Sequence, residues 1–181
     1  EDVFEVISAE FGSGKFAEQL KTWFKNAYLN HENLANATRY LANELFADHG
    51  LVIIDADDRE LKRLFIPQMQ KELVEQPAFK AVSETNKTLE HLGLKIQVNP
   101  REINLFYIHE GLRERIVEID GMFSVLDSQF QWTKEELTAH LNEYPERFSP
   151  NVIMRPLYQE VILPNLCYIG GGGEMIYWLQ L

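Results

Sequence analysis

Residues 103–126 read INLFYIHEGLRERIVEIDGMFSVL, and this stretch decides the fold of the middle of the chain. Apolar and polar residues alternate through much of it, as they do in strands with one buried face. Glu110-Gly111 and Asp120-Gly121 interrupt the alternation, and an acidic residue followed by glycine is typical of a tight hairpin turn. The stretch therefore predicts a small antiparallel meander with strands at 103–109, 114–119 and 122–126.

On both sides of the meander, apolar residues recur with helical spacing. Asp57 or Asp58 is placed to cap one helix, which Pro67 should kink or divide. Gly93 is placed to end the next helix, and Thr133-Lys134-Glu135-Glu136 is a capping-box pattern. The expected helices cover residues 16–27, 34–45, 58–73, 79–92, 133–143, 156–163 and 174 onward, with a break or bend at 30–33.

Short apolar runs lie between these helices. Leu51-Val52-Ile53-Ile54 and Asn165–Ile169 each lead toward a helix, and 94–98 alternates like a strand. Apolar runs bracketed by helices are typical of parallel strands that are buried on both faces. We therefore predict an α/β fold in which Val52–Ile54 and Leu166–Ile169 belong to one mainly parallel sheet. Its expected parts are 1–98 (helices and α/β), 99–130 (the inserted meander) and 131–181 (a return to the α/β core).

Composition narrows the possible functions. The 181 residues are 45% hydrophobic and carry a formal charge of −11, which argues against disorder and against a nucleic-acid partner. No apolar run is long enough to cross a bilayer, so no membrane partner is expected. Cys167 is the single cysteine, so no internal disulfide framework is expected, and we predict a buried, inert thiol in a cytoplasmic protein. Because the chain starts at Glu1 and ends within a helical pattern, we expect a fragment of a longer protein.

Gly170-Gly171-Gly172-Gly173 lies between a predicted strand and a predicted helix. Glycines allow a ligand to approach the backbone, and a helix N-terminus favours an anion. The pattern fits neither the Walker motif nor the dinucleotide-binding motif, so a plain tight turn remains an equal alternative. Glu174 is either a partner of the helix dipole or a polar ligand contact.

Asn151, Arg155 and Gln159 form a second candidate site. Pro156 should hold the backbone of Arg155 outside the helix, which would aim the guanidinium along a strand end. Arginine can grip a carboxylate or phosphate with two parallel hydrogen bonds. The alternative is a structural ion pair with one of the many acidic residues.

Two further patterns carry less weight. Asp55-Ala56-Asp57 resembles the Asp-x-Asp that holds a metal in some glycosyltransferases, although a helix cap explains one of its carboxylates better. Gly12-Ser13-Gly14-Lys15 is similar to a phosphate-binding loop, but Phe16 stands where a hydroxyl residue is needed. We interpret it as a helix-entry loop, and no metal site is predicted.

The stretch Ser149-Pro150-Asn151-Val152-Ile153-Met154-Arg155-Pro156-Leu157-Tyr158-Gln159 resembles the enzyme family that adds cysteine in bacillithiol biosynthesis. The resemblance covers most of the chain in order. Its other segments are Gly50–Asp55 with Asp58 and Leu61–Arg63, Asn104–Phe106, Tyr168–Glu174 and Tyr177–Leu181. One departure is Gly172, because the family usually has proline there.

The resemblance implies a larger cytoplasmic ligase with a Rossmann-like core, inserted elements and a coiled-coil arm. Its reaction joins the carboxyl of cysteine to the amine of glucosaminyl-malate, and such a carboxyl must first be activated, which points to ATP or ADP. The resemblance carries over no catalytic residue. From the local patterns, we expect Gly170–Gly173 to hold phosphate, Arg155 with Asn151 and Gln159 to bind substrate, and Glu174 to be catalytic. The isolated fragment is expected to be inactive, and its oligomeric state is open.

Two other functions remain open on sequence alone. Asp55 and Asp57 could serve a nucleotide-sugar transferase that uses a divalent metal. The chain could also be a non-catalytic ligand-binding domain.

Overall fold

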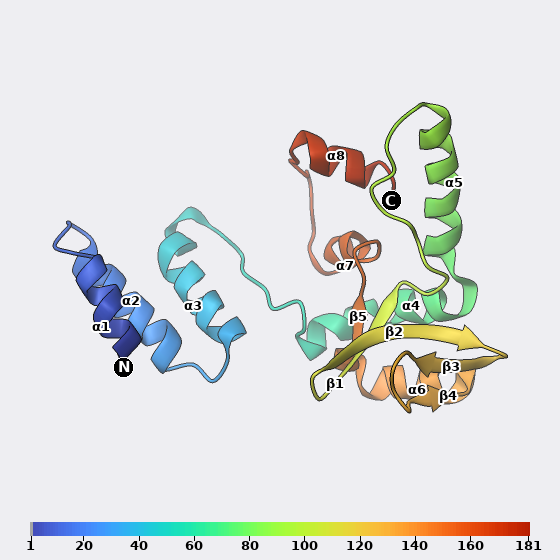
Figure 1. Cartoon of the computed structure of the whole chain (residues 1–181), viewed down its shortest axis with the longest axis horizontal. Helices are drawn as coiled ribbons and strands as arrows, with labels where there is room; N and C mark the ends of the chain where they lie inside the picture. The colour runs from blue at the N-terminus through green and yellow to red at the C-terminus, as the bar shows by residue number, and fades with distance from the viewer. Residues whose placement is uncertain (1) are drawn as a thin grey trace. The chain divides into compact units, whose positions relative to one another are not determined.

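The computed structural model describes residues 2–181, and the chain forms two compact units, Glu1–Ala56 and Asp57–Leu181 (Figure 1). Unit 1 is helical, with α1 (Asp2–Glu10), α2 (Ala17–Leu29), α3 (Leu34–Phe46) and the short 3-10 helix η1 (Ala47–His49). The predicted break at 30–33 is confirmed, because Asn33 caps α3 by accepting a 2.9 Å hydrogen bond from the Asn36 amide. Gly12–Lys15 lies in the α1–α2 connection, as expected of a helix-entry loop.

The predicted strand at the end of unit 1 is wrong. Residues 51–54 form no strand, and Val52 is 74% exposed. A strand needs a neighbour to satisfy its backbone groups, and no strand of the described residues pairs with this segment.

Unit 2 combines helices with a five-stranded sheet. Its helices are α4 (Arg59–Glu75), α5 (Pro77–His91), α6 (Lys134–Glu143), the 3-10 helix η2 (Pro145–Arg147), α7 (Arg155–Ile162) and α8 (Gly172–Trp178). Its strands are β1 (Leu105–His109), β2 (Leu112–Ile119), β3 (Met122–Val125), β4 (Gln131–Trp132) and β5 (Phe148–Pro150). The strand order is β4-β3-β2-β1-β5, and every pairing is antiparallel.

The predicted meander is confirmed and forms the centre of this sheet. Tyr107 pairs with Glu114 across the first hairpin, and Val117 pairs with Ser124 across the second. Both turn pairs have positive φ, at 44° and 84° for Glu110-Gly111 and at 52° and 79° for Asp120-Gly121. Two such residues in a row give the turn whose twist suits a hairpin, so local sequence chemistry sets this part of the fold.

The mainly parallel sheet predicted for the chain is wrong, although the α/β class holds. Leu166 and Ile169 lie in an extended connection between α7 and α8, where they are 102% and 93% exposed. The segment 94–98 is also not a strand. The described sheet instead recruits β4 at one edge, paired with β3, and β5 at the other edge, paired with β1, and the chain between them crosses the sheet through α6 and η2.

The core of unit 2 lies between the sheet and helices α4, α6 and α7. Phe65 and Met69 of α4 are fully buried, as are Leu141 of α6 and Phe148 of β5. Tyr158 of α7 packs its ring 5.0 Å from that of Phe65, so it belongs to this core. The core therefore fixes α7 against α4, and the first turn of α7 carries Arg155.

Most of the predicted helix signals are confirmed. The Thr133 and Glu136 side chains form the reciprocal capping box, and Asp58 caps α4 with bonds to the amides of Glu60 and Leu61. Gly93 follows α5 with a φ of 74°. Pro67 lies inside α4, which continues from Arg59 to Glu75, so of the two predicted outcomes, a kink or a division, the division does not occur.

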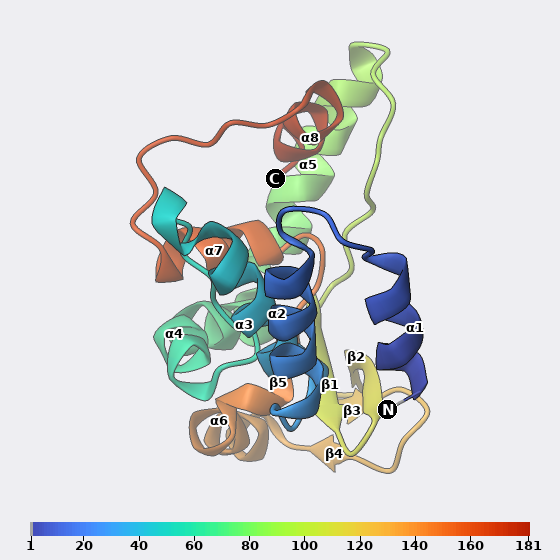
Figure 2. The same cartoon turned by 90° about the vertical axis from the view of Figure 1, so that its left-hand side faces the viewer.

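Gln180, which follows α8, hydrogen-bonds to Asn86 of α5, and α8 overlaps α5 in the view of Figure 2. The Gln180 side chain is fully buried; its amide nitrogen donates to Asn86 Oδ1 at 2.7 Å, and its oxygen accepts from the Gln97 amide at 2.8 Å. These bonds hold α8 in place within unit 2. Among the described residues, none of the helices is long and apolar enough to span a membrane.

Candidate functional site

Arg155 is the first residue of α7, and Gln159 lies one turn further along the same face. The Arg155 guanidinium donates to Gln159 Oε1 at 3.2 Å and is exposed to solvent. The prediction that Pro156 keeps Arg155 outside the helix is wrong. A proline in the first turn lacks only an N–H that has no partner inside the helix, so the helix can start before it.

Four glycines precede and open α8, and they are not equivalent. A Cβ on Gly170 would lie 2.9 Å from Cε1 of Tyr168, so any other residue here would have to displace this ring. A Cβ on Gly171, Gly172 or Gly173 would meet nothing within 4 Å. The backbone of these three residues is therefore open to an approaching group.

Arg155 and Gln159 of α7, Tyr168 from the connection, and Glu174 and Tyr177 of α8 form what we call the α7–α8 cluster. The Tyr168 hydroxyl donates to Glu174 Oε1, and the Tyr177 hydroxyl donates to the Val152 carbonyl ahead of α7. The structure thus brings together three residues predicted from sequence, namely Arg155, Gln159 and Glu174.

The electrostatics of the cluster reflect this proximity. The hydrogen bond to Glu174 raises the pKa of Tyr168, and burial raises the pKa of Tyr177. The Arg155 guanidinium acts against both shifts, and with Tyr177 it does so partly through a hydrogen bond.

Asn151 lies directly before this cluster, and its side chain has partners within the protein. Its oxygen accepts from the amides of Ile153 and Met154 at 2.9 and 3.2 Å, and its nitrogen donates to Asn104 Oδ1 at 2.9 Å. These bonds shape the turn into α7. That Asn151 contacts substrate stays a prediction.

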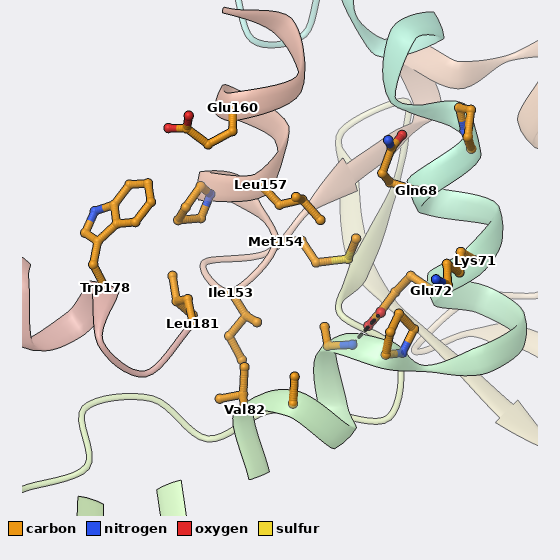
Figure 3. Close-up of a pocket in the computed structure, with 15 residues that line it drawn as sticks. Gln68, Lys71, Glu72, Val82, Ile153, Met154, Leu157, Glu160, Trp178 and Leu181 are labelled. Atoms are coloured by element: carbon orange, nitrogen blue, oxygen red, sulfur yellow. Dashed lines mark hydrogen bonds between the residues drawn. The ribbon is translucent and has the colours of Figure 1, made fainter. Parts of the chain in front are cut away.

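A cavity of about 620 Å³ lies beside the opposite face of α7 (Figure 3). Its walls are mainly apolar, and Figure 3 shows Leu157 and Met154 on one side and Val82 on another. Trp178 lines the cavity and also places its ring 4.5 Å from that of Tyr168. The cavity and the α7–α8 cluster therefore share Trp178 as a common wall.

Sequence reasoning missed the cavity and the buried carboxylate of Glu72 that lines it. Glu72 is fully buried and accepts hydrogen bonds from the amides of Ala78 and Asn104. Its position next to Leu73, on the apolar side of α4, is the one sequence signal that could have identified it. An acidic residue near an apolar stripe is usually solvated, so this signal is weak.

The predicted alternatives for the acidic segment are resolved in part. Asp57 Oδ1 lies 2.7 Å from the ammonium of Lys62, and Asp58 caps α4. Across residues 2–181 the structure brings no three His, Cys, Asp or Glu side chains together in a way that could hold a metal. Cys167 is exposed, so the prediction of a buried thiol is wrong; it followed from the strand that did not form.

Comparison with known proteins is consistent with the resemblance found in the sequence. The family model described as "Bacillithiol biosynthesis BshC, N-terminal Rossmann-like domain" matches residues 1–181. A protein of Christiangramia forsetii named "Putative cysteine ligase BshC" is 55% identical over 181 residues, which are 100% of this chain and 34% of that protein. A protein of the same name from Flavobacterium johnsoniae is 55% identical over 180 residues, covering 99% of this chain and 34% of its own length.

A more distant relative supports the same assignment. The Bacillus velezensis protein of that name is 34% identical over 160 residues, or 87% of this chain and 30% of its own length. The chain thus spans about a third of the length of these curated relatives. With a family match that runs from its first residue to its last, the chain belongs to the BshC family of bacillithiol biosynthesis, within the N-terminal Rossmann-like domain.

Proposed function

We propose that the protein containing this chain is a ligase that joins the carboxyl of cysteine to the amine of glucosaminyl-malate. Family membership supports the pathway, and the name shared by the relatives supports a cysteine ligase. The single structural observation that carries the proposal is the exposed Arg155 guanidinium, held by Gln159 in the α7–α8 cluster. It offers two parallel donors to a substrate carboxylate.

Both proposed substrates carry carboxylates, and the malate part of glucosaminyl-malate supplies more than one. In our proposal Arg155 binds one of these, with Gln159 fixing the plane of the guanidinium. Arginine stays charged at any physiological pH, so the site would bind anions throughout that range.

Glu174 supplies the second proposed role. Its exposed carboxylate already accepts the Tyr168 hydroxyl, which orients it at the start of α8. An amine must lose a proton to become part of an amide, and a carboxylate within hydrogen-bond reach can accept it. We assign Glu174 this catalytic role, with Tyr168 as its positioning partner.

A free carboxylate does not acylate an amine at a useful rate, so we propose ATP as co-substrate, which would activate the carboxyl as an adenylate or acyl phosphate. The open backbone at Gly171–Gly173 leaves room for a phosphate group, which supports Gly170–Gly173 as the phosphate-binding segment. Gly170 itself would contribute through its packing against Tyr168.

A nucleotide-sugar transferase is not favoured. Its metal would need Asp57 as a ligand together with Asp55, but the Asp57 carboxylate is engaged by the Lys62 ammonium. A non-catalytic binding domain is the remaining alternative. It would bind the same substrates as the ligase but would not convert them to product.

The test is a mass-spectrometric assay of the full-length protein with cysteine, glucosaminyl-malate and ATP. We expect the amide product, and none when ATP is left out. The isolated 181-residue chain should form no product, because it spans only about a third of the length of its relatives. Binding of glucosaminyl-malate without turnover by the full-length protein would support the binding-domain alternative and contradict the ligase.

A further inference from the structure

Glu72 begins a chain of buried hydrogen bonds that runs from α4 to the start of α7. Its carboxylate is fully buried, and Oε1 accepts both the backbone amide of Asn104, at 3.1 Å, and the side-chain nitrogen of Asn104, at 2.8 Å. Oε2 accepts the Ala78 amide at 3.2 Å (Figure 3). Burying a carboxylate against neutral donors costs free energy, which indicates a role for Glu72 beyond packing.

Asn104, directly before β1, is the middle of the chain. It is fully buried, and its side-chain oxygen accepts from the Asn151 side chain at 2.9 Å. Its carbonyl accepts from the Asn151 amide at 3.0 Å. Asn104 therefore holds Asn151 by both backbone and side chain.

Asn151 passes this constraint to Arg155. Its side-chain oxygen accepts the Ile153 and Met154 amides, and its carbonyl accepts the Arg155 amide at 2.9 Å. The same turn is fixed from its other side by Tyr177, whose hydroxyl donates to the Val152 carbonyl. The position of the first residue of α7 is thus set by a turn that Asn104 and Glu72 hold from within the core.

We propose that Glu72 and Asn104 are positioning residues that place the Arg155 guanidinium for substrate binding through Asn151. This inference rests on the proposed function in one respect, namely that Arg155 contacts a substrate carboxylate. We assign neither Glu72 nor Asn104 a contact with the substrate, because both are fully buried and their side-chain oxygens are hydrogen-bonded within the protein. Misplacing a binding group by about 1 Å can cost as much as a hundredfold in rate, so such remote residues can control affinity.

The experiment uses the full-length protein with Asn104→Ala, which removes the side-chain links to both Glu72 and Asn151. Glu72→Gln is the milder second variant, because it keeps the shape and removes the charge. For each variant we would determine a crystal structure and the KM for glucosaminyl-malate. We expect Arg155 to move by about 1 Å and the KM to rise roughly tenfold to a hundredfold.

Two controls separate positioning from general stability. Tyr107→Phe removes another hydrogen bond of a buried side chain, the 2.8 Å contact with His140 Nε2, which lies outside the chain of bonds from Glu72 through Asn104 to Asn151. It should lower the melting temperature and leave both the KM and the place of Arg155 unchanged. In an Arg155→Ala background, Asn104→Ala should change the KM by less than about twofold, because the residue through which it acts is gone.

The outcomes are distinguishable. If Arg155 moves but the KM is unchanged, the positioning role stands and the proposed substrate contact of Arg155 fails. If Arg155 stays in place in both Asn104→Ala and Glu72→Gln, the inference is overturned whatever the KM does. A KM that rises equally with and without Arg155 would also overturn it, since the effect would not pass through that residue.

Discussion

The side chain of Lys62 is 1% exposed, and its ammonium lies 2.7 Å from Oδ1 of Asp57, whose side chain is 68% exposed. Lys62 also donates to the Glu146 carbonyl at 2.9 Å. Lys62 of α4 thus holds the Asp57 carboxylate, from the segment before α4, against the helix. Through the Glu146 carbonyl, Lys62 also links α4 to η2. The segment that suggested a metal site from sequence is used instead to neutralise a core lysine.

We predict that Asp57→Asn lowers the free energy of unfolding by about 1–3 kcal/mol, because the buried ammonium loses its anionic partner. Asp58→Asn is the matched control, since asparagine caps a helix as well as aspartate does, and it should be nearly neutral. Urea unfolding of the two variants measures the difference. Equal stability of both variants would show that the Lys62 pair contributes little.

Replacing Arg155 with Lys should weaken glucosaminyl-malate binding nearly as much as replacing it with Ala, by about 1.5–3 kcal/mol, or roughly tenfold to a hundredfold. Lysine keeps the charge but cannot offer the planar pair of donors. Calorimetric titration of the full-length protein gives the affinity. Arg63→Lys, at an exposed arginine that pairs with Glu60, is the control and should bind normally.

For Arg155 a structural ion pair would give the opposite pattern. Affinity would then stay normal in Arg155→Lys while the melting temperature fell. That result would remove Arg155 from the proposed site.

Gly172→Pro should stabilise the protein by about 0.4–1 kcal/mol. Gly172 is the first residue of α8, where proline fits, and Gly171 before it has a φ of −69° and a ψ of 164°, which a residue preceding proline favours. The gain comes from restricting the unfolded chain, and thermal unfolding measures it. Gly170→Ala is the contrasting variant and should lose stability, because its Cβ would lie 2.9 Å from the Tyr168 ring. A loss of stability in Gly172→Pro would mean that α8 does not begin where it does here.

Protonation of His140 should lower the free energy of unfolding in weakly acidic solution. Burial is the main cause that lowers its pKa, and the nearby Arg147 guanidinium adds to it, while Glu143 and Glu146 act in the opposite direction. The unfolded chain therefore binds a proton more readily than the folded one. Stability from the neutral imidazole is complete above the unfolded pKa of about 6.5 and is lost as the pH falls through the folded value.

The measurement is the free energy of unfolding against pH, between about pH 5 and 7.5, for the wild type and for His140→Gln. We expect the dependence to be shallower in the variant, which can keep a hydrogen bond to Tyr107. Identical curves would contradict the assignment to His140.

The sequence predicted the parts of the fold that local chemistry determines. Asp120-Gly121 defines a hairpin turn, and Thr133 with Glu136 defines a helix start, because each signal is complete within a few residues. The strands predicted at 51–54 and 166–169 are wrong. An apolar run shows that a segment has few polar side chains, but it does not show which other segment, if any, pairs with it.

The same distinction, between local signals and contacts over long sequence separations, applies to the candidate site. The sequence singled out Arg155, Gln159 and Glu174 one by one, but it placed Arg155 outside the helix, so the contact of Arg155 with Gln159 along one face of α7 was not predicted. The Glu72 to Asn104 and Asn104 to Asn151 bonds could not be predicted, since they join residues 32 and 47 positions apart. Trp178 was likewise predicted only as part of a helix, and its place between the cavity and Tyr168 depends on the packing of α8.

Cys167 is the single cysteine of these 181 residues, and it is exposed in the connection that carries Tyr168. A maleimide fluorophore added to the chain would therefore attach at one known position, without prior removal of other thiols. Its emission would report solvent and ligand changes one residue away from the tyrosine that orients Glu174. The connection between α7 and α8, which was predicted to be a strand, thus gives the chain a natural attachment point for a spectroscopic probe.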